Sequence, residues 1–234
     1  MTKRYSATIF AAAFLSATAA HAELVTNGSF ENGVNVPGTN SDRTLGVGST
    51  DMTGWTVVDN SGNPAGSTGN NLIWIGNGGF GLSSPFGNDF IDLTGTTDSV
   101  PFVGVAQTLT TVAGQSYAIT FDLGVEAGGG IFGGPITVNV GAGSATTTVT
   151  DTGTSGTTTS DGTIWTDETV DFTATSTSTQ LSFIGETGIE FIGLDNVSVN
   201  AENVSPPPIP EPATIALLGT GLFGIALVRR RRRG

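Results

Sequence analysis

The residues from 117 to 123 decide the fold, and they read Tyr117-Ala-Ile-Thr-Phe-Asp-Leu123. The large apolar side chains Tyr117, Ile119, Phe121 and Leu123 alternate with small or polar ones. Successive side chains of a β-strand point to opposite faces, so this alternation indicates a strand with one face against a core. Residues 112–115, Val-Ala-Gly-Gln, are typical of a hairpin turn leading into such a strand.

Similar short runs of β-branched and aromatic residues recur along the chain, each bounded by the turn formers Gly, Asn, Asp or Pro. No window shows a helical period. We expect further strands at 54–58, 72–75, 90–93, 103–109, 136–140, 146–150, 169–174, 180–184 and 191–199. The pattern predicts an all-β, antiparallel sandwich. Trp55 and Trp165 are expected in its core, and the Gly-rich segments 60–71 and 126–134 are expected to be surface loops.

The N-terminal residues have the pattern of an export signal. Lys3 and Arg4 precede an apolar stretch from Ala7 to Ala20, and Ala20-His21-Ala22 matches the small-x-small pattern that signal peptidase cleaves. We therefore assign residues 1–22 to a signal peptide and residues 23–201 to one domain, which is long enough for a buried core.

The C-terminal residues have three parts. A Pro-rich linker, 202–212, leads into sixteen uncharged residues, Ala213 to Val228, and then into five arginines. As a helix the apolar run is about 24 Å long, short of a hydrocarbon core of roughly 30 Å, so it spans a membrane only marginally. We predict one transmembrane helix and an Arg-rich tail within 213–234, with the preceding domain on the far side of the membrane.

This order of parts resembles the PEP-CTERM sorting signal. The residues that carry the resemblance are Pro210, Glu211, Pro212, Arg229, Arg230, Arg231, Arg232 and Arg233. The resemblance implies that an exosortase removes the tail at the inner membrane of a Gram-negative bacterium, leaving the protein at the cell surface or outside the cell. The alternative is an ordinary single-span anchor.

Removal of both ends leaves a strongly acidic domain. Arg43 is then the one cation against twenty carboxylates, a formal charge of −19 (1 − 20). This charge repels phosphate backbones and excludes nucleic acid as a partner. The chain has no cysteine, and the mature part has neither lysine nor histidine, which excludes the usual nucleophile systems and histidine-ligated zinc.

Five segments of the domain resemble bacterial choice-of-anchor C domains, which are galactose-binding-like jelly rolls. These segments are residues 24–31, 54–57, 90–95, 107–122 and 194–199. The resemblance implies that the first and last strands lie side by side and that a structural calcium ion sits near them, with Glu31 and Asp195 as candidate ligands. Calcium binds six to eight oxygens, and only these two side chains can be nominated. The alternative is that Asp195 caps a turn and Glu31 is solvated.

A glycan site needs aromatic faces beside polar side chains. The candidates lie in or next to a Gly- and Asn-rich segment and are Trp74, Asn77, Phe80, Phe86, Asn88 and Asp89. The alternative places Trp74 in the core, with Phe80 and Phe86 packing the loop onto the sandwich.

The sequence thus predicts an exported, non-catalytic module that associates with extracellular polysaccharide or a biofilm matrix. One alternative is a structural matrix protein without a discrete ligand. Another is a glycoside hydrolase that uses carboxylates alone, with Asp89 and Asp92 or Asp167 and Glu168 as the acid pair.

Overall fold

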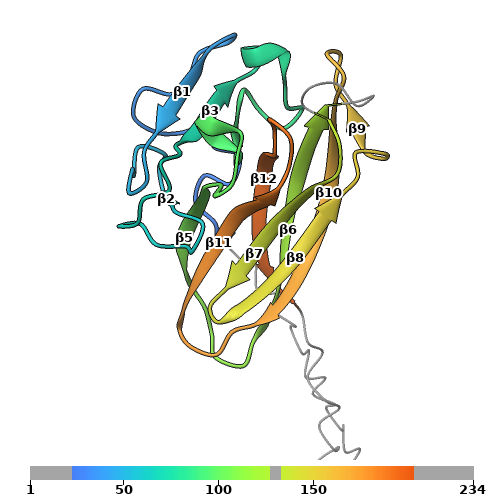
Figure 1. Cartoon of the computed structure of the whole chain (residues 1–234). Coiled ribbons are helices and arrows are strands. Elements are labelled where there is room, and N and C mark those ends of the chain that lie inside the picture. Colours follow the sequence, from blue (N-terminus) through green and yellow to red (C-terminus); the bar gives the residue numbers. More distant parts are fainter. Residues whose placement is uncertain (1–22, 127–132, 203–234) are drawn as a thin grey trace, which may run out of the picture. The chain divides into compact units, whose positions relative to one another are not determined.

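The computed structural model describes residues 23–126 and 133–202, which form a sandwich of two antiparallel sheets (Figure 1). The predicted signal peptide, sorting residues and transmembrane helix lie outside these ranges, so the boundaries at both ends of the domain stay predictions. Within the described ranges, no helix has the length and apolar character needed to cross a membrane.

The larger sheet has seven strands. Their order across the sheet is β1 (Asp42–Leu45), β3 (Leu72–Gly76), β4 (Asp89–Asp92), β12 (Gly193–Ala201), β6 (Ser116–Glu126), β10 (Thr163–Thr173) and β9 (Thr157–Thr158). Short 3-10 turns, η1 (Gly79–Gly81) and η2 (Gly95–Thr97), flank β4.

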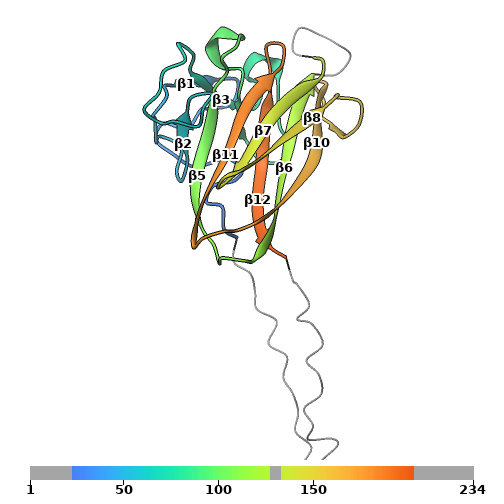
Figure 2. The same ribbon diagram turned by 60° about the horizontal axis from the view of Figure 1, so that its bottom comes forward.

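The smaller sheet has five strands. Their order is β2 (Thr56–Val58), β5 (Gly104–Thr110), β11 (Ser178–Thr187), β7 (Ile136–Ala142) and β8 (Ala145–Asp151). Figure 2 shows β5, β11 and β7 running side by side. Strands distant in sequence are neighbours in both sheets, as in a jelly roll, and the predicted all-β sandwich is confirmed.

Strand β6 lies in the interior of the larger sheet, between β12 and β10. The side chains of Tyr117, Ile119, Phe121 and Leu123 are buried, as their alternation predicts. Two strands were not predicted from the sequence, because β1 contains Arg43 and little apolar surface, and β9 is only two residues long.

The main core lies between the sheets and contains Trp55, whose ring centroid is 5.4 Å from that of Phe30 and 6.4 Å from that of Phe183. A second apolar cluster consists of Ile75, Leu82, Phe90, Trp165 and Phe191. Because Phe90 belongs to this cluster and its neighbour Ile91 to the main core, the cluster lies on the outer face of the seven-stranded sheet.

Trp165 lies against two glycines of that outer face. A Cβ atom added at Gly124 would come within 2.9 Å of the Trp165 ring, and one at Gly193 within 3.0 Å. The missing side chains therefore make room for the indole, whose Nε1 donates to the Ser83 carbonyl over 2.8 Å. This packing fixes the segment 77–88, called the 77–88 loop below, onto the sheet.

Candidate functional site

The 77–88 loop is organised by one of the predicted ligand residues. The Asn77 side chain donates to the carbonyls of Ser84, over 3.1 Å, and Gly87, over 2.8 Å, and it accepts from the Ser84 amide over 2.8 Å. Both the side-chain oxygen and the side-chain nitrogen of Asn77 are hydrogen-bonded within the loop, so Asn77 fixes the conformation of the 77–88 loop.

The three predicted aromatic residues have different positions. Trp74 is fully buried, and its Nε1 donates to the Phe30 carbonyl over 3.0 Å, so its assignment to a glycan-stacking face is wrong. Phe86 is half-buried and lies edge-on against Trp165, with 6.1 Å between ring centroids. Phe80 alone of the three is 53% exposed. The alternative prediction, a core position for Trp74 and a loop-packing role for Phe86, is therefore correct for these two residues. Phe80 instead is available to a ligand.

Phe80 borders a cavity of about 160 Å³, called the Phe80 pocket below. Its lining residues are Ile73, Ile75, Phe80, Leu82, Asp92, Asp98 and Glu190. Phe80, Asp98 and Glu190 all have positive φ angles, of 53°, 47° and 60°. Such angles are uncommon for residues other than glycine, and residues that adopt them cluster at functional sites.

Asp92 is the buried acid of this pocket. Its Oδ1 accepts from the Thr94 amide over 2.9 Å, the Thr94 hydroxyl over 2.8 Å and the Ile192 amide over 3.0 Å. Burial raises the pKa of Asp92 to about 7, and the Asp98 charge acts in the same direction. From the sequence, Asp92 is predicted only as half of a catalytic pair, and Asp98 and Glu190 are not predicted at all, because no local pattern links the three residues.

A second group of acids consists of Glu31, Asp89 and Asp195 and is called the carboxylate cluster. The Oε1 atom of Glu31 accepts from the backbone amides of Asn88, over 2.7 Å, and Asp89, over 2.8 Å. Fully buried Asp195 accepts from the Ser84 hydroxyl and from the Asn196 amide. Glu31, predicted as a metal ligand, thus binds the backbone at Asn88 and Asp89, two residues predicted as sugar ligands.

Within this cluster, the Glu31 charge repels the carboxylates of Asp89 and Asp195. Burial raises the pKa of Asp195 to about 8, with further contributions from the charges of Glu31 and Asp122. Burial and the Glu31 charge raise the pKa of Asp89 to about 7. The structure therefore brings Glu31 and Asp195 close enough to interact, although 164 residues separate them in sequence.

The cluster partly fits a hard cation. The Oδ1 atom of Asp89 is buried without a hydrogen-bond partner, and an oxygen in that state is a suitable calcium ligand. Over 23–126 and 133–202, however, no three or more Asp, Glu, His or Cys side chains are grouped as a ready metal site. A calcium ion here would thus also need hydroxyl, backbone or water oxygens.

The two acid pairs proposed for catalysis do not converge. Asp89 interacts with Glu31, whereas Asp92 lines the Phe80 pocket. Asp167 and Glu168 are adjacent on β10, so their side chains leave the strand on opposite faces.

A wide, open hollow of about 520 Å³ lies on the side of the five-stranded sheet and was not predicted. Its lining residues are Thr26, Gly54, Thr56, Val58, Pro64, Ala106, Gln107, Thr108 and Gln180. The Gln107 amide is occupied by the Thr26 backbone, with bonds of 2.7 and 2.9 Å. The lining contains neither an aromatic nor a charged side chain, so the Phe80 pocket is chemically the more selective site.

Comparison with protein families gives two matches. Residues 23–193 match the family described as "Protein of unknown function (DUF642)". Residues 208–233 match the PEP-CTERM protein-sorting motif, which confirms the prediction from the C-terminal sequence and indicates export and sorting to the cell surface. No curated protein matches this chain significantly.

Several solved structures are similar to this chain at low identity. One, described as "CBM4 structure and function", is 17% identical with a TM-score of 0.35, over 76% of this chain and 99% of the other. The CBM22-1 xylan-binding domain of Paenibacillus barcinonensis Xyn10C is 14% identical with a TM-score of 0.39, over 79% and 97%. An isomalto-dextranase of Arthrobacter globiformis T6 is 18% identical with a TM-score of 0.41, over 63% of this chain and 23% of the enzyme.

Proposed function

The chain belongs to the family Protein of unknown function (DUF642), and from the geometry of its surface we propose that it is an exported, non-catalytic module that binds polysaccharide through the Phe80 pocket. The observation that carries this proposal is the exposed Phe80 ring at the edge of a cavity that also contains carboxylates. An aromatic face packs against the C–H surface of a sugar ring, and carboxylates accept hydrogen bonds from its hydroxyls.

The sorting motif supports the cellular setting of this function. We propose that signal peptidase removes residues 1–22 and that the C-terminal helix holds the protein transiently in the inner membrane. An exosortase then removes the tail, as the PEP-CTERM match implies. The released domain associates with polysaccharide or biofilm matrix at the surface of a Gram-negative cell.

Substitution of Phe80 tests the binding proposal. We expect Phe80→Ala to reduce retention of the exported protein on its polysaccharide roughly tenfold, because the stacking face is lost. Val112→Ala is the matched control, since Val112 is 64% exposed but lies in the turn between β5 and β6. Retention would be measured by affinity electrophoresis across neutral and charged polysaccharides, and equal retention of the two variants would refute the role of the pocket.

We further propose a structural calcium ion at the carboxylate cluster, with Glu31 and Asp195 as ligands and the remaining oxygens supplied by hydroxyls, backbone carbonyls or water. The unpartnered Oδ1 of Asp89 and the repulsion of both Asp89 and Asp195 by the Glu31 charge support it. The ion would neutralise acids that have no nearby basic side chain, since Arg43, the one Lys or Arg of residues 23–202, is bound to Asp51. It would fasten the N-terminal segment to the 77–88 loop and to β12.

A structural matrix role without a ligand is the second candidate function. The specific observation in its favour is strand β8, where four consecutive residues, 145–148, are exposed and three of them are threonine. A non-binding matrix protein predicts no saturable retention on any polysaccharide, which the same electrophoresis measures.

A further inference from the structure

The Phe80 pocket has acidic side chains on three separate segments. Asp92 ends β4, Asp98 follows η2, and Glu190 precedes β12. Outside the lining, Asp42 of the adjacent strand β1 pairs in register with the lining residue Ile75. Arg43 does not neutralise these acids, because its guanidinium contacts the Asp51 carboxylate and the Val34 carbonyl. Within the part of the chain that the structure describes, the pocket therefore has an excess of negative charge.

The remaining wall of the pocket is apolar. Ile73, Ile75 and Leu82 accompany the exposed ring of Phe80. A volume of about 160 Å³ corresponds to roughly five water molecules at about 30 Å³ each, which is room for one small ring. A ligand that contacts both the apolar wall and the acidic wall therefore needs an apolar face and a positive charge on the same small ring.

The hydrogen bonds of the acids argue against a bare metal ion as this ligand. Oδ1 of Asp92 already accepts from two backbone amides and a hydroxyl, so Asp92 has little capacity left to coordinate a metal ion. The Glu190 carboxylate has no hydrogen bond to the described residues and is available to a donor on the ligand. A hydrated cation would also gain nothing from the apolar wall.

We propose that the Phe80 pocket selects a sugar unit with a free, protonated amine, so that the preferred ligand is a polysaccharide containing amino sugars that are not N-acetylated. This inference rests on the proposed function, because it names the ligand class of the same site. The C–H face of the sugar packs on Phe80, and the ammonium group donates to Glu190, with the Asp98 carboxylate in the same pocket. The ammonium group also gains a cation–π contact when it approaches the ring.

The net charge of the protein supports the approach of such a ligand. The formal charge of the whole chain is −12. Every lysine and arginine except Arg43 lies in one of the two ends that we propose are removed by processing. A polycationic glycan is therefore attracted over about a Debye length, and this attraction weakens as salt is added. The contacts within the Phe80 pocket add to the binding affinity separately, and a substitution of one pocket residue measures their contribution.

The test compares three oligosaccharide series of equal length on the full exported protein by isothermal titration calorimetry. The series are oligomers of glucosamine, N-acetylglucosamine and glucose. We expect the glucosamine series to bind roughly tenfold more tightly than the other two, because one charge-assisted hydrogen bond is gained. Glu190→Gln should remove that preference, so that glucosamine and glucose oligomers bind the variant with equal affinity.

Asp171→Asn is the matched control, because it removes the same charge from an exposed position on β10. An equal loss of glucosamine binding in Glu190→Gln and Asp171→Asn would mean that only the net charge matters and would overturn the inference. Equal affinity for all three series, with Phe80→Ala still defective, would overturn the amine preference and leave polysaccharide binding at the pocket intact. Absence of binding to every series and to the polysaccharide panel would overturn the proposed function as well.

Discussion

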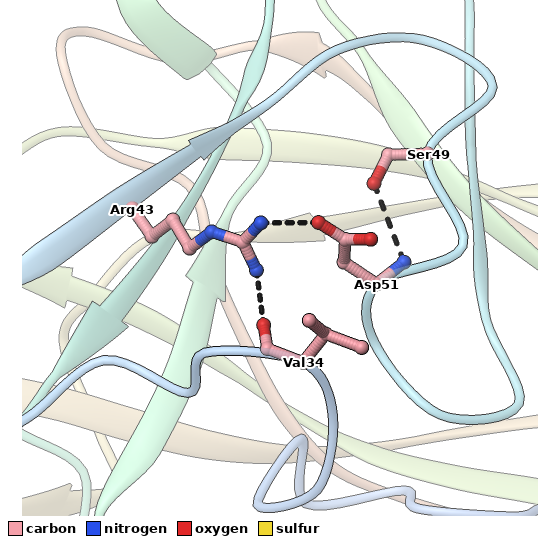
Figure 3. Close-up of polar contacts among 4 residues, drawn as sticks. All are labelled: Val34, Arg43, Ser49 and Asp51. Atoms are coloured by element: carbon pink, nitrogen blue, oxygen red, sulfur yellow. Dashed lines mark hydrogen bonds and ion pairs between the residues drawn. The ribbon is translucent and has the colours of Figure 1, made fainter.

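The Arg43 contact and the carboxylate cluster are two acidic regions that treat negative charge differently. At the first, the Arg43 guanidinium contacts the Asp51 carboxylate and the Val34 carbonyl, and Asp51 is also placed by its amide, which donates to the Ser49 hydroxyl over 3.3 Å (Figure 3). At the second, Glu31 and Asp195 accept bonds from backbone amides and from the hydroxyl of Ser84, and among residues 23–126 and 133–202 they have no basic partner.

Both regions attach the segment that precedes β1 to the sandwich, the first through Val34 and the second through Glu31. The Arg43 contact carries its own counter-charge, and its half-exposed groups lose little hydration. The carboxylate cluster is buried, so it needs a proton or a cation from solution. The pH and the calcium concentration should therefore change the stability contributed by the carboxylate cluster and leave that contributed by the Arg43 contact nearly unchanged.

The largest expected effect is the dependence of thermal stability on pH and calcium. Burial raises the folded-state pKa of Asp195 to about 8 and those of Asp89 and Asp92 to about 7, so the folded protein favours their protonated forms. This contribution to stability is fully present below the unfolded pKa of about 3.9 and is lost as pH rises through 7 to 8.

In chelator, the midpoint of thermal unfolding should therefore fall by roughly 10 °C between pH 5 and pH 9. Calcium should remove most of this fall, because a bound divalent ion stabilises the ionised forms of Glu31, Asp89 and Asp195. Calorimetry of the exported protein with calcium or with chelator measures both. Identical curves in the two solutions would disprove the calcium site.

Asp195→Asn gives the next largest effect and separates repulsion from metal binding. Asparagine preserves the shape and removes one charge from beside Glu31 and Asp122, so the variant should melt several degrees above the parent in chelator at pH 8. Calcium should then stabilise the parent but not the variant. Asp171→Asn is the control for net charge. A full calcium response in Asp195→Asn would show that Asp195 is not a ligand.

Arg43→Met gives the smallest effect and tests whether the two regions are independent. Methionine preserves much of the apolar stem but removes the contacts to Asp51 and Val34, at a cost of about 1 kcal/mol. The unfolding midpoint should fall by roughly 2–4 °C, equally with calcium and with chelator. A calcium response that changes in this variant would show that the two fastenings are coupled.

Trp74 and Phe80 show where prediction from the sequence stops. Both are aromatic and both flank Gly-rich turns. In β3 the inward side chains Leu72 and Trp74 alternate with Ile73 and Ile75, which face a second apolar cluster. Because both faces of β3 are apolar, no alternation of polar and apolar residues reveals which side is the core. Trp74 is therefore buried, although its sequence context also fits an exposed aromatic.

The acids show the same limit. Glu31 and Asp195 were predicted as calcium ligands from a family resemblance, and in the structure the Glu31 charge contributes to the raised pKa of Asp195. Asp98 and Glu190 were not predicted to meet Asp92, because the pocket forms only where three loops meet beside β3 and β4. The hollow on the five-stranded sheet had no signal in the sequence, since its threonines and glutamines resemble those of any polar strand.

The sequence by itself determined the all-β class, the buried face of β6, the sorting motif and the scarcity of basic side chains. These follow from local alternation, from a contiguous motif and from composition, none of which depends on contacts between distant residues. The tertiary structure decided which aromatic is exposed and which carboxylates share a pocket or repel one another. Those outcomes depend on pairing between strands far apart in the chain, and long-range pairing determines burial and therefore the electrostatics of each acid.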